Sequence, residues 1–170
     1  GYQGWFLAPG DGSQVNGWSH WFRNDTADGA DATTDLWPDM TELGPSERFD
    51  TLMTLPDGSP AQAYSAYLPA TVDRHFAWMQ TAGIDGVFLQ RFISELGDPR
   101  FLDMRDQVAR NVRAGAEAHG RVFAIEYDIS GADPTTIESV LEDDWAYLVD
   151  TLQITSSPPY LHHDGKPVLA

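Results

Sequence analysis

Two carboxylates stand close together at the end of an apolar run, in the segment AIEYDIS at 124–130. If this run is a strand, side-chain alternation sends Glu126 and Asp128 to one side and Tyr127 to the other. If the strand belonged to a β-barrel and this side faced the barrel interior, charge repulsion and desolvation would raise the pKa values of the two carboxyl groups. Carboxylate pairs carry out glycoside hydrolysis, so both are supporting catalytic candidates. The alternative is a structural pair, hydrogen-bonded to backbone or to arginine.

Aromatic side chains gather near the start of the chain. They are Trp5, Trp18, His20, Trp21, Phe22 and Trp37. Aromatic faces stack on the C–H faces of sugars, while carboxylates and imidazoles bind sugar hydroxyls. The cluster therefore favours a sugar-binding cleft. The alternative is that the rings fix a long loop to the rest of the protein.

A glutamine and an arginine end the preceding apolar run, at Gln90 and Arg91. The arginine could pair with Glu126 or Asp128, or it could clamp an anionic or polyol substrate. Of these, an ion pair within the barrel is the interpretation that we favour.

Metal and cofactor sites are poorly supported by the sequence. The acidic loop 24–35 fits a calcium-binding loop only in part, because Asn24 and Thr26 replace acidic ligands and the final glutamate is missing. The histidines show no metal-binding spacing, and His75 is expected to pack or cap. We therefore predict no metal and no cofactor.

Short strands and helices alternate around these residues. Apolar runs predict strands at 2–8, 84–92, 121–129 and 167–170, and helical spacing predicts helices at 71–82, 98–120 and 133–152. The order is β-α-β-α-β-α-β, with parallel strands. It fits an open doubly wound sheet or the first half of a (β/α)8 TIM-type barrel. No glycine-rich dinucleotide motif follows any strand, and a complete barrel takes about 250 residues, so we favour the first four βα units of a barrel.

The connection 9–70 is far longer than a minimal βα loop. It contains a predicted hairpin, with strands at 49–55 and 62–68 joined by a turn at 56–58. In a barrel this long loop after strand 1 would lie at the carboxyl ends of the strands, where active sites are built.

The net charge and composition of the chain restrict the kinds of molecule that it can bind. The 170 residues carry a formal charge of −16 and an isoelectric point near 4.3. Such a chain repels phosphate and anionic lipid, which argues against nucleic-acid and membrane partners. The absence of cysteine excludes disulfides and thiolate chemistry. Because the chain starts at Gly1 without a leader and stops as a strand begins, we expect a fragment of one domain, 1–170, truncated at strand 4.

Five short motifs are spread over nearly the whole chain. They are YQGWF at 2–6, WSHW at 18–21, RHFAWM at 74–79, AGIDGV at 82–87 and FAIEY at 123–127. Together they resemble the glycoside hydrolase family 71/99-like group, which is commonly found in secreted bacterial proteins. In this group, family 99 contains endo-α-mannosidases and α-mannanases, and family 71 contains α-1,3-glucanases.

The resemblance implies a (β/α)8 barrel that hydrolyses an α-linked polysaccharide or glycan and is secreted or periplasmic. It also implies that the main catalytic glutamates lie beyond Ala170, while Glu126 matches a carboxylate at the end of the corresponding family strand. The substrate-binding candidates are Trp5, Trp18, His20, Trp21, Gln90, Arg91, Glu126 and Tyr127. The main rival is a non-catalytic carbohydrate-binding protein on the same barrel. A sugar-phosphate isomerase or aldolase is a weaker option, because no lysine ends a strand.

Overall fold

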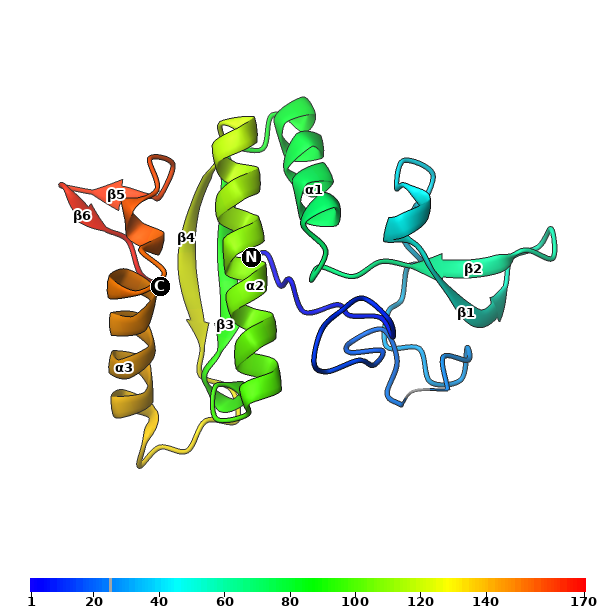
Figure 1. Ribbon diagram of the computed structural model, residues 1–170, viewed down its shortest axis with the longest axis horizontal. Helices are drawn as coiled ribbons and strands as arrows, with labels where there is room; N and C mark the ends of the chain where they lie inside the picture. The colour runs from blue at the N-terminus through cyan, green and yellow to red at the C-terminus, as the bar shows by residue number, and fades with distance from the viewer. Residues whose placement is uncertain (25) are drawn as a thin grey trace.

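The computed structural model describes residues 1–24 and 26–170, so Asp25 of the acidic loop lies outside the described residues. Helices and short strands alternate along the second half of the chain (Figure 1). The elements are η1 (Pro45–Glu47), β1 (Phe49–Thr54), β2 (Pro60–Ala63), α1 (Pro69–Ala82), β3 (Gly86–Phe92), η2 (Ile93–Glu95), α2 (Pro99–His119), β4 (Val122–Asp128), α3 (Ile137–Asp150), η3 (Ile154–Ser156), β5 (His162–His163) and β6 (Lys166–Pro167).

The centre of the fold is the parallel pair of β3 and β4. Their register runs without a shift from Gly86 opposite Val122 to Phe92 opposite Asp128. Single parallel bridges extend this pair on both sides, from Tyr2 to Leu89 and from Leu169 to Ile125. Four segments therefore lie side by side in chain order, which is the arrangement that the predicted β-α alternation requires. This α/β architecture is consistent with part of a barrel.

Both ends of α2 follow local signals in the sequence. Asp98 accepts a hydrogen bond from the Arg100 N–H at the first turn, and Gly120 ends the helix in the left-handed conformation at φ 60°. The predicted helices 71–82 and 133–152 start at different residues. Leu68 rather than Thr71 precedes α1, and the Asp133 carboxylate builds a turn by accepting from the Thr135 N–H, so that α3 starts only at Ile137.

The main core lies on one face of the β3–β4 pair. Phe123 and Ile125 are fully buried there, packed with apolar residues of all three α-helices. On the opposite face of the strands, Phe88 and Val122 remain 39% and 40% exposed. The helices therefore cover only one side of the sheet. In Figure 1, α2 runs alongside the strands, in front of β3 and with β4 beside it.

The first segment is not the continuous strand predicted for 2–8. Only Tyr2 forms a bridge, because the chain turns at Gly4, which has a φ of 53°. A Cβ at Gly4 would lie 2.6 Å from Val108 Cγ1, so the close approach to α2 also requires glycine. Beyond the turn, Leu7 and Phe6 hydrogen-bond to Ser19 and Ala66 instead of to a strand.

The long connection folds as a separate layer beside α1. The predicted hairpin is confirmed as the antiparallel pair of β1 and β2, although β2 occupies 60–63 instead of 62–68. A second apolar cluster supports it, formed by Ala8, Trp18, Trp21, Phe22, Ala27 and Ala63. In Figure 1 this hairpin extends away from the end of the molecule that carries α3.

The last predicted strand, 167–170, is divided between two pairings. Lys166 and Pro167 form β6 and pair with His162 and His163 of β5 in an antiparallel hairpin. Leu169 then forms the parallel bridge to Ile125.

Candidate functional site

Polar side chains line the open face of β3 and β4 near the carboxyl ends of the strands. Gln90 and Glu126 are opposite each other in the register, and the Gln90 amide donates a short hydrogen bond to the Asp128 carboxylate. Glu126 points to the same side, since its Oε2 lies 3.5 Å from the position of a Cβ on Gly1. The prediction that Glu126 and Asp128 share a face, opposite to Tyr127, is confirmed.

The electrostatic environment of Asp128 differs from the one expected. Hydrogen bonds from the Ser130 side chain and backbone hold the pKa of Asp128 below its usual range. The expectation of a raised pKa is therefore wrong for Asp128. This carboxylate accepts hydrogen bonds, which stabilise its ionised form, instead of facing a like charge without any donor. An ionised carboxylate beside an amide is suited to accept hydrogen bonds from hydroxyl groups.

An aromatic stack stands beside these strand ends. The Trp5 ring is stacked with His20, with ring centroids 4.2 Å apart and planes 8° from parallel. It is also stacked with Phe92, the last residue of β3, at 5.3 Å. The Arg105 guanidinium lies 5.1 Å from the centre of the Phe92 ring. The stack therefore fixes the long loop to the end of β3 and leaves Trp5 and His20 half-buried.

The His20 imidazole is neutral near pH 7. Burial lowers its pKa, an effect that the nearby Glu95 carboxylate opposes. His20 has a φ of 60°, an unusual conformation for a residue other than glycine, and its carbonyl accepts a short hydrogen bond from Thr33. A neutral imidazole offers a sugar hydroxyl one donor and one acceptor.

Arg91 lies on the opposite side of β3 and does not contact Glu126 or Asp128. Its side chain is 1% exposed and donates to Asp144 at 2.6 and 2.7 Å and to Asp106 at 2.8 Å. The predicted ion pair exists, but its predicted partners are wrong. Alternation along β3 places Arg91 under α2 and α3, where it ties the helices to the sheet.

Three other sequence candidates are also buried. Tyr127 donates to Asp144 at 2.5 Å on the helix side of β4. Trp21 is 2% exposed, and its Nε1 donates to the Tyr64 carbonyl. Trp18 is 7% exposed and packs edge-to-face on Phe22. The structure thus brings together Trp5, His20, Gln90, Glu126 and Asp128, but places Trp18, Trp21, Arg91 and Tyr127 in the interior.

Sequence reasoning missed Phe92, Arg105 and Glu95. Arg105 is 3% exposed and forms a short ion pair with Glu95, the last residue of η2 after β3. Phe92 could have been recognised from its place as the aromatic residue that ends the predicted strand 84–92. No local signal pairs Arg105 with Glu95, since they come from different elements.

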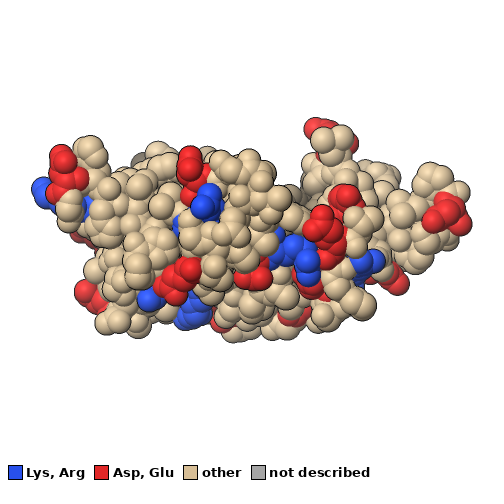
Figure 2. Space-filling view, turned by 90° about the horizontal axis from the view of Figure 1, so that it is seen from above, with Lys and Arg blue, Asp and Glu red and all other residues tan. Residues whose placement is uncertain are grey.

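Residues 1–24 and 26–170 contain neither a cluster of metal-ligating side chains nor a membrane-spanning helix. No group of three or more histidine, aspartate or glutamate side chains in these ranges is placed to hold a metal ion. No helix within them is long and apolar enough to cross a membrane. Figure 2 shows one face of the molecule, on which acidic side chains are spread from end to end with basic ones interspersed.

The sequence matches no protein-family model and no curated protein. Solved structures do match. The GH99 endo-α-mannosidase from Bacteroides thetaiotaomicron has a TM-score of 0.56 and 16% identity, over 99% of this chain and 42% of that one. A second structure of this type of enzyme, in complex with Bis-Tris propane, has a TM-score of 0.55 at 16% identity, over 99% and 39% of the two chains. The chain thus spans about two fifths of these enzymes and has a GH99-like fold over that part.

Proposed function

We propose that this chain belongs to a glycoside hydrolase that cleaves an α-linked polysaccharide or glycan, such as a mannan or a glucan, in an endo-acting manner. The observation that carries the proposal is the site at the strand ends, where the Trp5–His20 stack stands beside Gln90, Glu126 and Asp128 on a GH99-like fold. Half-buried aromatic rings next to hydrogen-bond acceptors are the combination that binds a pyranose ring.

In this proposal, residues 1–170 supply the first four βα units of one (β/α)8 domain. The open face of β3 and β4 would line the barrel interior, which accounts for the exposure of Phe88 and Val122. The main catalytic glutamates would then belong to the other half of the barrel. The proposal includes a secreted or periplasmic location in a bacterium, as the resemblance to the family 71/99-like group implies.

Glu126 would accept hydrogen bonds from substrate hydroxyls instead of cleaving the bond itself. Such a hydrogen bond, strengthened in the transition state, is worth about 2–4 kcal/mol, or roughly 10²–10³ in rate. We therefore expect Glu126→Gln to lower kcat/KM on the cleaved α-glycan by that factor, with an unchanged melting temperature. Arg91 is not a partner of Glu126, so this substitution leaves no unpaired buried cation.

The matched control is Glu142→Gln, which makes the same chemical change at an exposed position of α3. It should retain full activity. Full activity per folded molecule in Glu126→Gln would show that the strand-end carboxylate has no role in substrate binding or catalysis.

The second candidate function is a non-catalytic carbohydrate-binding protein on the same fold. It is favoured by the lowered pKa of Asp128, which suits a permanent hydrogen-bond acceptor better than a proton donor. A full chain that binds an α-glycan reversibly but releases no reducing ends from it would support this alternative.

A further inference from the structure

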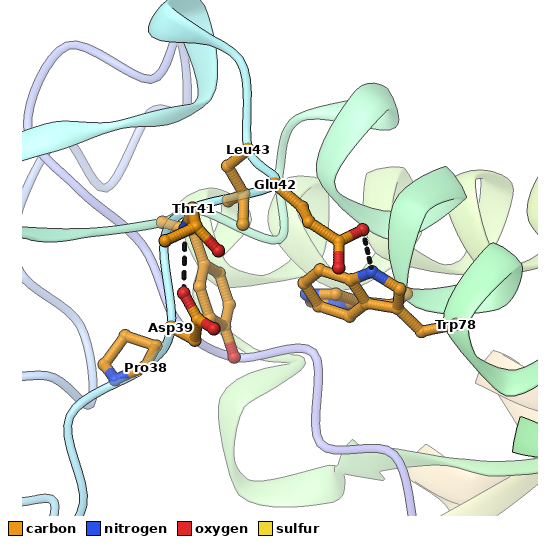
Figure 3. Close-up of a pocket in the computed structure, with 8 residues that line it drawn as sticks. Pro38, Asp39, Thr41, Glu42, Leu43 and Trp78 are labelled. Atoms are coloured by element: carbon orange, nitrogen blue, oxygen red, sulfur yellow. Dashed lines mark hydrogen bonds between the residues drawn. The ribbon is translucent and has the colours of Figure 1, made fainter.

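A second hollow lies away from the strand ends, between α1 and the segment before η1. Its volume is about 450 Å³, within the range typical of small-molecule sites. Its lining includes Asp39, Thr41, Glu42, Tyr64, His75 and Trp78 (Figure 3). It shares none of its lining residues with the Trp5–His20 stack or the polar side chains of β3 and β4.

Hydrogen bonds and ring contacts fix Trp78 in this hollow. Its Nε1 donates to Glu42 Oε2 at 2.9 Å, and the ring lies 5.5 Å from the His75 ring, tilted by 31°. His75 is held in turn by the Tyr2 hydroxyl, 2.8 Å from its Nδ1, and by the edge of the Tyr64 ring. An aromatic ring fixed in this way offers a stacking surface that needs little ordering when a ligand binds.

Two carboxylates line the same hollow as this ring. Asp39 accepts from the Thr41 N–H through Oδ1 at 2.9 Å, and Glu42 accepts from Trp78 through Oε2. Figure 3 shows both carboxylates at the hollow, with Trp78 below Glu42. Asp39 also accepts from the Thr41 side chain. Glu42 Oε1 has no hydrogen-bond partner among the described residues and is available to accept from a ligand hydroxyl. No lysine or arginine is among the residues that line this hollow.

A neighbouring hollow of about 410 Å³ continues on the other side of the same segment. The two share Pro38, Asp39 and Thr41 in their linings. The second is lined by Trp37, whose Nε1 is fixed by the Gln62 carbonyl at 2.9 Å. Each hollow thus has an indole ring whose N–H is hydrogen-bonded, and Asp39 and Thr41 line both hollows, an arrangement suited to a chain of sugar rings.

We propose that these two hollows form an accessory binding site for a neutral glycan chain, with a pyranose unit stacked on Trp78 and hydrogen-bonded to Asp39 and Glu42. The site is separate from the proposed site at the strand ends, and only its ligand class rests on the proposed function. Asp39 and Glu42 disfavour an anionic sugar at Trp78 by charge repulsion. Arg48 lines the second hollow, and its guanidinium donates to the Leu43 and Thr41 carbonyls.

The test measures retention of the full chain by native gel electrophoresis in a soluble α-mannan, a soluble α-glucan and polygalacturonate. We expect stronger retention by a neutral polymer than by polygalacturonate. Loss of the stacking surface in Trp78→Ala should weaken neutral-polymer binding about tenfold. Trp78→Phe, which keeps a ring, should recover most of that loss. Leu52→Ala, an exposed apolar change on β1 outside both hollows, should bind like the unaltered chain.

Asp39→Ala provides a second measurement if Trp78→Ala fails to fold, because Asp39 is exposed. It should also weaken retention. Unchanged binding in folded Trp78→Ala and Asp39→Ala would overturn the accessory site, as would a chain that binds no neutral α-glycan or binds polygalacturonate equally well.

Failure of the two proposals gives different results. Binding that is lost in Trp5→Ala but unchanged in Trp78→Ala would overturn the accessory site and leave the strand-end site in place. Binding that weakens in Trp78→Ala, in a chain that hydrolyses none of these polymers, would support the accessory site and count against hydrolysis.

Discussion

Arg91 illustrates how a single buried charge depends on its partners. Its guanidinium is shared between Asp106 and Asp144, both of which are nearly buried. Arg91→Met would leave two carboxylates without their cation in the interior, which costs about 3–5 kcal/mol of unfolding free energy. Urea unfolding at pH 7 measures this loss.

The exposed pair of Arg100 and Asp98 provides the comparison, since Arg100 is 57% exposed. Arg100→Met should cost far less, because solvent screens an exposed ion pair. Equal losses in the two variants would mean that the Arg91 network adds nothing beyond a surface ion pair.

His75 makes stability depend on pH. Burial lowers the pKa of His75 to about 4, although the Glu47 charge opposes the shift, whereas an unfolded histidine titrates near 6.5. Between these values the unfolded chain binds a proton that the folded chain does not. The free energy of unfolding therefore falls as the pH drops from about 6.5 to about 4, by up to about 3 kcal/mol.

His75→Gln removes this titration and keeps an acceptor for the Tyr2 hydroxyl. Its stability should be less dependent on pH in the same window, as measured by urea unfolding at several pH values. Some dependence should remain, because burial also lowers the pKa of His20. Parallel curves for the two proteins would show that His75 is not the titrating group.

At the scale of elements, the contact between β3 and β4 depends on Gly86. A Cβ at this position would lie 1.8 Å from the Val122 carbonyl oxygen, which is backbone and cannot move aside. We expect Gly86→Ala to lower the unfolding free energy by about 3 kcal/mol or more. Gly97→Ala is the matched control, because nothing lies within 4 Å of a Cβ there, and it should be neutral or slightly stabilising. Thermal unfolding of both variants tests the difference.

Elements set by neighbouring residues could be predicted from the sequence, and those set by distant ones could not. The ends of α2 follow from Asp98 and Gly120, which act within one turn of the helix. The partners of Arg91 could not be predicted, because they depend on which face of β3 the helices cover. Glu42 and Trp78 are 36 residues apart and meet only through packing on α1, so the accessory site that we propose could not be predicted from the sequence.

For the whole molecule, the uncovered face of the sheet is the feature with the largest consequence. Phe88 and Val122 remain exposed there, and the flanking segments are held by single bridges. Exposed apolar surface beside weakly paired strand edges promotes association between chains. We expect a polypeptide limited to residues 1–170 to aggregate or to lack a cooperative thermal transition. A monomer with a sharp transition in calorimetry and sedimentation would contradict this expectation.

The contacts of Arg91 also affect which parts of the protein unfold locally and transiently. They join β3 to α2 and α3, which are far apart along the chain. Neither helix can detach from the sheet without leaving a buried charge unpaired, so local opening of one helix alone is disfavoured. Amide hydrogens in the middle of α2 and α3 should therefore exchange with deuterium at similar rates, as parts of one cooperative unit, while those of the β1–β2 hairpin exchange independently and sooner.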